Sequence, residues 1–240
     1  MSMTFTGTFV EKIRRSPGAV SFRFTRPPAY SFEAGQSFSI TIPSPEGPLV
    51  HQFSHADSPT EPHTELTTRM TGSPFKTALD ALVPGTEAVF RGPQGRFLFR
   101  YDLPKLAFLT GGVGITPVRS ILRYLVDTGG AGRLQGQEIV LVYGCMTEDD
   151  IIYREEIDAA ARSLAGLRVI YVVTQPNAGW KGYGGFITAD ILRAELGDAS
   201  AWTYYVVGPP PMIVAMDKVT GVLQIPDSQI VKESFAGYTS

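Results

Sequence analysis

The segment LAFLTGGVGITPVRSILRYL, residues 106–125, decides the fold of the second half of this chain. Its first residues form an apolar run typical of a buried strand, which ends in the glycine-rich turn 110–114. Thr116 is predicted to cap a helix that begins at Pro117, because threonine accepts backbone hydrogen bonds and proline suits a helix start. Free N–H groups at a helix start, beside glycines that allow close approach, suit a pyrophosphate. The segment therefore predicts a nucleotide-binding turn, although it matches neither the G-x-G-x-x-G nor the P-loop pattern.

The composition is that of a globular protein with little net charge. Of the 240 residues, 43% are hydrophobic and 18% are charged, and the formal net charge of −2 gives no support for nucleic-acid binding. A single cysteine, Cys145, excludes an internal disulfide framework, and with only three histidines we expect no metal site. No apolar run reaches the roughly 18 residues of a membrane span, and the first residues lack the core of a signal peptide. We therefore expect a cytoplasmic protein without a transmembrane segment.

Two different sequence patterns indicate two domains, which we place at residues 1–101 and 102–240. In the first, short alternating runs are separated by proline, glycine and serine, a pattern typical of an antiparallel β-barrel. Its predicted strands are residues 4–10, 20–24, 37–42, 64–70 and 87–91, and its predicted helix is residues 74–82.

In the second half, apolar strands alternate with amphipathic helices. The predicted strands are residues 106–109, 139–143, 169–173 and 204–207, and the predicted helices are residues 118–126, 150–164 and 212–223. This alternation is typical of a doubly wound parallel sheet. The expected fold class is therefore β plus α/β, an antiparallel barrel followed by a parallel-sheet domain.

Three motifs in a fixed order give the chain a resemblance to a known family. They are Gly-Pro-Gln-Gly-Arg-Phe at 92–97, Gly-Gly-Val-Gly-Ile-Thr-Pro at 111–117 and Gly-Pro-Pro-Pro-Met at 208–212. With these motifs the chain resembles the ferredoxin–NADP reductase superfamily, and in particular its compact members that consist of a flavin domain and a pyridine-nucleotide domain. The resemblance implies an FAD cofactor held by the barrel and NADH or NADPH as the hydride donor.

The resemblance assigns the flavin site chiefly to segments of the first half. The family pattern Arg-x-Tyr/Phe-Ser reads His51-Gln52-Phe53-Ser54 here, so Phe53 is expected to pack on the flavin and Ser54, the expected catalytic residue, to lie near flavin N5. His51 replaces the arginine that pairs with a flavin phosphate in the family, and imidazole mimics a guanidinium poorly. Arg69 and Ser73 are expected to compensate, Ser73 because it precedes a predicted helix start. The full expected set is His51, Gln52, Phe53, Ser54, Thr68, Arg69, Met70, Gly72, Ser73, Phe75, Phe235 and Tyr238.

The resemblance places the pyrophosphate of the nucleotide on the glycine turn and the nicotinamide beside the proline-rich loop. The residues expected there are Thr110, Gly111, Gly112, Gly114, Thr116, Gly144, Gly208, Pro209, Pro210 and Met212. Many NADPH-using relatives carry an arginine after the second strand, whereas here Glu148–Asp150 is acidic and Arg154 is the first basic residue. This favours NADH, since carboxylates repel a 2′-phosphate. The same acidic residues could serve only to begin the next helix.

The chain end resembles the Glu-x-Phe-x-Gly-Tyr ending of compact relatives, in which it returns to the flavin. Here this is Glu233–Tyr238, so Phe235 or Tyr238 is expected near the flavin, as a gate over the ring or as an ordinary packed aromatic.

The predicted function is hydride transfer from NAD(P)H to bound FAD, with electrons passed to a separate protein carrier or small molecule. Two alternatives stay open: a free-flavin or ferric-chelate reductase that holds its flavin loosely, and a non-catalytic flavin- or nucleotide-binding regulatory module. Four arginines of the first half are either a docking patch for an acidic carrier or a solvated face. They are Arg14, Arg15, Arg23 and Arg26.

Overall fold

The computed structural model describes residues 2–129, 134 and 136–234, and its contacts divide the chain into two compact units. The first unit comprises Met1–Phe99 together with Thr116–Tyr124, and the second comprises Arg100–Ile115 together with Leu125–Ser240. The contacts thus group residues 116–124, which the sequence pattern placed in the second domain, with the first unit.

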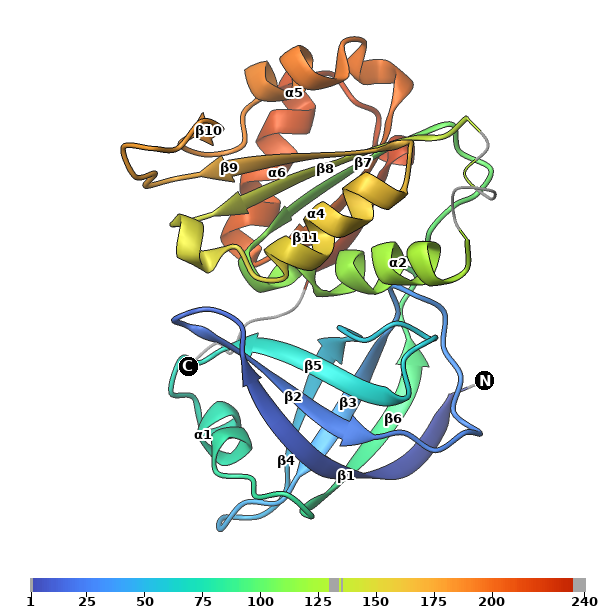
Figure 1. Ribbon diagram of the computed structural model, residues 1–240, viewed down its shortest axis with the longest axis vertical. Coiled ribbons are helices and arrows are strands. Elements are labelled where there is room, and N and C mark those ends of the chain that lie inside the picture. Colours follow the sequence, from blue (N-terminus) through green and yellow to red (C-terminus); the bar gives the residue numbers. More distant parts are fainter. Residues whose placement is uncertain (1, 130–133, 135, 235–240) are drawn as a thin grey trace. The chain divides into compact units, whose positions relative to one another are not determined.

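The first unit is built on a six-stranded antiparallel sheet with the strand order β4-β3-β6-β1-β2-β5 (Figure 1). The strands are β1 (Met3–Arg14), β2 (Ala19–Thr25), β3 (Ser37–Ile42), β4 (Leu49–Ser54), β5 (His63–Arg69) and β6 (Glu87–Gln94). The curled sheet encloses an aromatic core that includes Phe22, Phe24, Phe38 and Phe90, all without exposed surface. Helix α1 (Pro74–Asp80) adds Phe75 to that core. The predicted antiparallel barrel is confirmed.

The second unit is a six-stranded parallel sheet with the order β10-β9-β8-β7-β11-β12. The strands are β7 (Lys105–Gly111), β8 (Glu138–Cys145), β9 (Leu167–Val173), β10 (Tyr183–Gly184), β11 (Thr203–Gly208) and β12 (Ile230–Ser234). Helices α5 (Ala189–Leu196) and α6 (Pro210–Val222) pack on one face, over Val140, Val142 and Val206. Helix α4 (Arg154–Ser163) lies on the other face, where Asp158 accepts a hydrogen bond from Tyr171 (Figure 1). The predicted doubly wound sheet is confirmed.

The helix after the glycine turn begins earlier than the sequence predicted. Residues Gly112–Gly114 form a 3₁₀ turn, and helix α2 (Ile115–Asp127) follows it without a break. Thr116 is therefore inside the helix, and the prediction that it is the N-cap is wrong. The turn tightens the chain directly after β7, so helical geometry is already established before Pro117.

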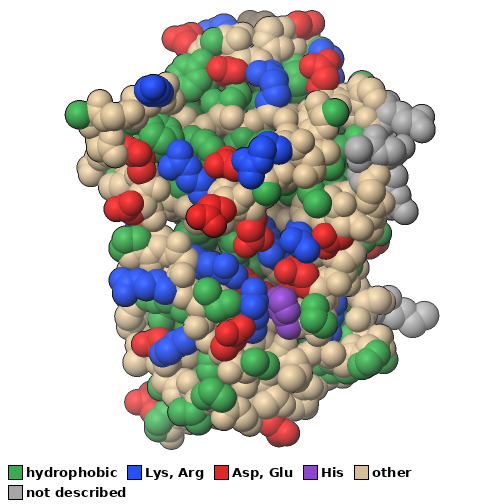
Figure 2. Space-filling view, in the orientation of Figure 1, with side chains coloured by type: hydrophobic (Ala, Val, Ile, Leu, Met, Phe, Trp, Pro, Cys, Tyr) green, Lys and Arg blue, Asp and Glu red, His purple; other side chains and the backbone are tan. Residues whose placement is uncertain are grey.

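Among the described residues of the second unit, one α-helix and two strands have no counterpart in the sequence-based prediction. They are α5, β10 and β12, of which the two strands are the edges of the sheet. Within the described residues, none of the helices has the length and apolarity needed to cross a bilayer. Figure 2 shows acidic, basic and apolar side chains interspersed over the face that it presents.

A substitution at Gly35 measures how closely the backbone of the first unit packs at this position. Its φ is +97°, and a Cβ built on it lies 2.0 Å from the carbonyl oxygen of Phe97. We expect Gly35→Ala to lower the free energy of unfolding by about 3 kcal/mol or more, because backbone must move to admit the methyl group. The matched control is Gly85→Ala, where φ is also +97° but nothing lies within 4 Å, so only about 1 kcal/mol should be lost. Equal losses in urea unfolding would contradict the tight contact.

Candidate functional site

The strand order of the parallel sheet identifies one place where a ligand is expected. From β7 the chain runs outward through β8, β9 and β10, and it then returns to place β11 on the other side of β7. Two neighbouring strands whose connections leave in opposite directions create a crevice at their carboxyl ends, where ligands bind in open α/β sheets. Here those ends are Thr110-Gly111 of β7 and Gly208 of β11.

The loops at this switch point pack closely at three of their glycines, against backbone at Gly114 and against the Met212 side chain at Gly111 and Gly208. A Cβ on Gly114 would lie 2.7 Å from both Gly208 Cα and Val207 O. A Cβ on Gly111 or Gly208 would lie 2.5 or 2.7 Å from Met212 Sδ. The glycine turn and the Gly208–Met212 loop, which the sequence predicted as parts of one nucleotide site, are therefore brought together.

Polar groups at the same edge are oriented by the fold or lack a partner. The Tyr143 hydroxyl donates to Gly112 O at 3.0 Å and so ties the glycine turn to β8. Gly144, at the end of β8, lies opposite Gly111 in the parallel register. Thr110 Oγ1 is buried and has no hydrogen-bond partner among the described residues. An orphaned hydroxyl beside a glycine cradle fits a nucleotide, because buried polar atoms are rarely left unpaired.

Glu233 is a residue of this edge that the sequence did not single out for the site. It lies on β12 opposite Val207, next to Gly208. Burial raises its pKa to about 7, and Oε2 has no partner in the part of the chain that the structure describes. The signal that could have found it is its place at the start of the C-terminal Glu-x-Phe-x-Gly-Tyr motif.

The acidic residues after β8 have local structural partners. Thr147 and Asp150 form a capping box, with Thr147 N donating to Asp150 Oδ2 at 3.2 Å. Glu148 Oε1 accepts a hydrogen bond from Asn177 N at 3.1 Å. The guanidinium of Arg154 lies over the rings of Tyr171 and Trp180, at 5.5 and 5.6 Å from their centroids. The first basic residue after β8 is thus held by aromatic contacts.

Phe186 is an exposed aromatic residue close to this edge. It follows β10, which pairs with the carboxyl end of β9, and 70% of its surface is exposed. The next residue, Ile187, is buried and approaches Gly144, since a Cβ on that glycine would lie 3.5 Å from Ile187 Cδ1. An exposed ring at the carboxyl edge of the sheet offers a stacking surface for a nucleotide base.

In the first unit, the residues expected to bind flavin come from three segments. These are the end of β4, the end of β5 and the start of α1, and β4 contacts both β5 and α1. His51, Phe53 and Phe75 form an aromatic cluster, with ring centroids 4.7 Å apart for His51–Phe53 and 5.3 Å for His51–Phe75. His51 is therefore packed against the residues that the resemblance places beside the flavin.

Positive charge is concentrated next to this aromatic cluster. Burial and the positive charge of Arg69 lower the pKa of Lys76, and burial and the positive charge of Lys76 lower the pKa of His51. A basic group that lowers the pKa of another lies close to it, and an anion beside both relieves the repulsion. Arg69 was expected from the sequence, whereas Lys76 was missed although it belongs to the motif around Ser73–Phe75.

Some of the remaining residues expected to bind flavin have partners within the barrel, and others have a hydroxyl without a hydrogen-bond partner among the described residues. Gln52 donates to Ser37 Oγ at 3.1 Å, and Met70 packs partly buried against the barrel core. Ser54 is 3% exposed, and its Oγ, like that of Ser73, is buried without a partner among the described residues. Orphaned hydroxyls beside aromatic rings and basic groups fit a flavin with its phosphates. Phe235 and Tyr238 lie outside the described residues.

Three of the four arginines considered from the sequence bind buried carboxylates, whereas Arg14 is exposed and donates to Pro17 O at 3.3 Å. Arg15 and Arg23 bind the buried carboxylate of Glu65, at 2.8 and 2.7 Å. Arg26 binds the buried carboxylate of Asp57 at 3.0 Å. Buried carboxylates require such partners, so these arginines serve the interior of the barrel.

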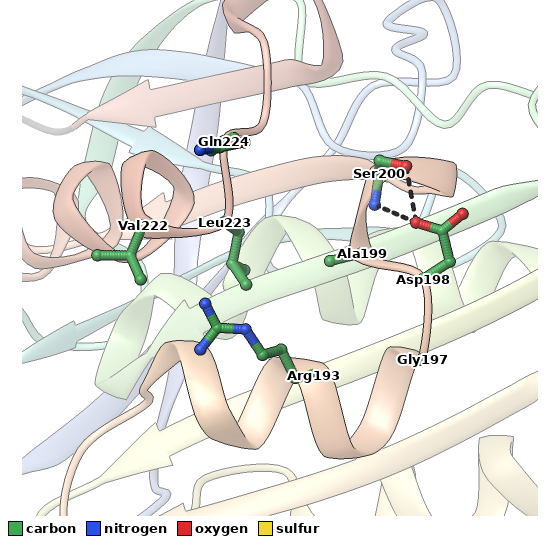
Figure 3. Close-up of a pocket in the computed structure, with 8 residues that line it drawn as sticks. All are labelled: Arg193, Gly197, Asp198, Ala199, Ser200, Val222, Leu223 and Gln224. Atoms are coloured by element: carbon green, nitrogen blue, oxygen red, sulfur yellow. Dashed lines mark hydrogen bonds between the residues drawn. The ribbon is translucent and has the colours of Figure 1, made fainter.

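One further hollow lies at the amino end of β11, away from the carboxyl edge (Figure 3). Its polar groups bond to one another or to neighbours: Asp198 accepts from both N and Oγ of Ser200, and Arg193 pairs with Asp190. It is lined by Arg193, Gly197, Asp198, Ala199, Ser200, Val222, Leu223 and Gln224.

Comparisons with known proteins show which oxidoreductases the chain is similar to. Residues 108–218 match the family described as the oxidoreductase NAD-binding domain. The chain is 33% identical over 186 residues to ferredoxin–NADP reductase B of Sorangium cellulosum, a match that covers 75% of this chain and 74% of the relative. It is 34% identical over 148 residues to NADH-cytochrome b5 reductase 1 of Ajellomyces capsulatus, covering 60% of this chain. That match spans 47% of the relative, so the chain corresponds to about half the length of this protein.

A solved structure with the same fold covers nearly the whole chain. The cytochrome b5 reductase domain of Ulva prolifera nitrate reductase superimposes with a TM-score of 0.82, over 96% of this chain and 97% of that domain. The sequences are 22% identical, so this likeness establishes the fold.

Glu233 generates a pH prediction. Its raised pKa means that the folded state holds a proton between pH 4.5 and 7 that the unfolded state has released. The free energy of unfolding therefore falls as pH rises through this range. We expect Glu233→Gln to be more stable than the parent chain above pH 7, by an amount on the order of 2 kcal/mol, and equal to it near pH 4. Urea unfolding at both pH values measures this, and a difference independent of pH would contradict it.

Proposed function

The chain belongs to the ferredoxin–NADP reductase superfamily of FAD- and NAD(P)H-dependent oxidoreductases, and on that basis we propose that it oxidises NADH through bound FAD and passes the electrons to a separate acceptor. The observation that carries the proposal is the pair of sites in one chain. One unit has a glycine-lined switch point with an orphaned threonine, and the other has an aromatic and basic cluster beside an orphaned serine.

Each group of residues has a defined role in this proposal. Flavin, when bound, supplies the redox chemistry: it accepts hydride at N5 and releases electrons singly or in pairs. Phe53 and Phe75 provide apolar surface for the ring system, and Arg69 and Lys76 provide charge for its phosphates. Ser54 offers a buried hydroxyl to a flavin atom. The backbone of Gly111–Gly114 leaves room for the pyrophosphate of the nucleotide, and the Phe186 ring offers a stacking surface for its base.

The proposed preference for NADH rests on the residues that follow β8. A 2′-phosphate needs a cation, and Arg154 is held against Tyr171 and Trp180. Glu148 lies at the carboxyl end of the same strand and repels a phosphate. The relative from Ajellomyces capsulatus is named NADH-cytochrome b5 reductase 1, which supports this preference, whereas the relative from Sorangium cellulosum is named for NADP.

The second candidate function is a reductase that exchanges its flavin as a substrate. His51 favours it, because the imidazole stands where the family has a phosphate-pairing arginine and is packed against two phenylalanines.

A separate protein, such as a cytochrome b5 or a ferredoxin, is the acceptor class that the names of the relatives suggest. We also propose a cytoplasmic location, which fractionation of the source cells would test.

The function is tested by the absorbance of the purified protein between about 350 and 500 nm. We expect a flavin band that bleaches when NADH is added without oxygen, and more slowly with NADPH. If the band appears only after FAD is added and is lost on desalting, but still bleaches, the flavin-exchanging reductase is the function. A protein that takes up neither FAD nor NADH would contradict both.

The basic cluster generates a prediction about flavin affinity. We expect Lys76→Gln to weaken flavin binding about tenfold, because a charge-assisted hydrogen bond to phosphate contributes about 1.5–3 kcal/mol. We expect His51→Arg to strengthen it by a similar factor. Lys181→Gln, which removes the same charge from an exposed loop of the second unit, is the matched control. Fluorescence titration with FAD measures all three, and a Lys76 variant that binds like the Lys181 variant would remove Lys76 from the site.

A further inference from the structure

Directly after Ser54 the barrel contains a buried relay of three polar side chains. The Tyr30 hydroxyl lies 3.0 Å from His55 Nε2, and His55 Nδ1 lies 3.0 Å from Asp57 Oδ1. Burial and the nearby negative charge of Asp57 raise the pKa of Tyr30, so its hydroxyl stays protonated and acts as a hydrogen-bond donor. With its own proton on Nδ1, the imidazole accepts from Tyr30 and donates to Asp57.

The three side chains of this relay are buried. His55 and Asp57 have no exposed surface. The imidazole stacks on Phe32, with ring centroids 3.6 Å apart and planes 10° apart. The Gly92–Phe97 motif supports the other end, because a Cβ on Gly92 would lie 2.7 Å from the Tyr30 hydroxyl.

Asp57 is compensated by partners from other parts of the barrel. Its Oδ1 also accepts from Glu65 N at 2.8 Å, and its Oδ2 accepts from Arg26 at 3.0 Å. A buried ionic network of this kind is weak evidence for stability, since apolar residues of similar volume are often as stable. What such a network provides when fully satisfied is one fixed arrangement of the chain.

The arrangement that it fixes is that of the main chain leaving β4. His55 N donates to Gln36 O and Ala56 N to Glu65 O, both at 2.9 Å. Arg119 donates to Ala56 O at 2.9 Å, and Ser120 Oγ donates to Asp57 O at 2.6 Å. Both peptide groups after Ser54 are therefore held, while Ser54 Oγ itself has no partner among the described residues.

We propose that His55 is a positioning residue, which through Tyr30 and Asp57 holds the Ser54 hydroxyl in the place where it meets the flavin. The inference rests on the proposed function, because it concerns what Ser54 does toward that cofactor. His55 contacts neither flavin nor nucleotide in this account.

The test is a double-mutant cycle of Ser54→Ala and His55→Leu, read by the rate constant of anaerobic flavin reduction at saturating NADH. Each single variant should lower the rate about tenfold, because Ser54→Ala removes the hydroxyl that meets the flavin and His55→Leu misplaces it. The double variant should be no more than about twofold slower than Ser54→Ala, since His55 acts through Ser54. The two single variants should also share one shift in the visible band of the bound, oxidised flavin.

Conservative variants separate positioning from simple destabilisation. His55→Gln can donate to Asp57 and accept from Tyr30, so it should stay within about threefold of the parent rate. Thr67→Val removes a hydrogen bond to Ser21 in the same barrel, and it should lower the urea midpoint without changing the rate or the spectrum. If His55→Leu does not fold, Tyr30→Phe, which removes only the hydroxyl, should show the spectral shift and a smaller loss of rate.

Two results overturn the inference. One is an additive cycle, in which the double variant is about a hundredfold slower than the parent, and the other is a parent-like spectrum and rate in His55→Leu or, if that variant does not fold, in Tyr30→Phe. If the parent chain itself binds flavin but is not reduced by NADH, the proposed function fails, and this inference falls with it.

Discussion

A fully buried carboxylate, that of Asp57, is the constraint on which the first unit depends. A charge without exposed surface must be compensated, and its partners are the neighbouring His55, the backbone of Glu65 and the distant Arg26. Meeting that requirement fixes the chain where it leaves β4, directly beyond Ser54. The barrel thus holds the chain beyond Ser54 in one arrangement by burying polar groups, where an apolar core would specify the path of the chain less uniquely.

The second unit depends on a different constraint, which is the small space between the loops at the carboxyl edge of its sheet. At the carboxyl ends of β7 and β11, a Cβ on Gly114 would meet the backbone of Val207 and Gly208, and a Cβ on Gly111 or Gly208 would meet the Met212 side chain. Close packing leaves backbone groups as the surface that a ligand meets, and the parallel sheet orients that surface outward. Glu233 adds a carboxyl group whose pKa of about 7 makes it able to hold or release a proton near neutrality.

The sequence predicted the parts of this molecule that depend on local patterns. Apolar strands followed by glycine turns located β7 and the turn after it, and alternation located most of the barrel. The start of α2 was misjudged, because the 3₁₀ turn at Gly112–Gly114 depends on the packing of the loops around it. The short edge strands β10 and β12 carry too few residues for a clear alternation.

The buried relay could not be predicted from the sequence, because its polar residues read as a loop. Tyr30 and His55 are 25 residues apart, and only the folded barrel brings them to hydrogen-bond distance. The ion pairs of Arg15, Arg23 and Arg26 could not be predicted for the same reason: their partners, Glu65 and Asp57, are distant in sequence and buried. Lys76 was missed because its closeness to Arg69 depends on how the chain turns between the end of β5 and α1.

The central claim is that hydride passes from the nicotinamide to flavin held by this chain. Rapid mixing of the flavin-loaded protein with NADH, and with NADH deuterated at the transferred position, tests it most directly. The account predicts that the flavin band bleaches and that deuterium slows the bleaching, because a C–H bond breaks in that step. A band that persists while NADH is shown to bind would contradict it, and would identify the chain as a binding module without turnover.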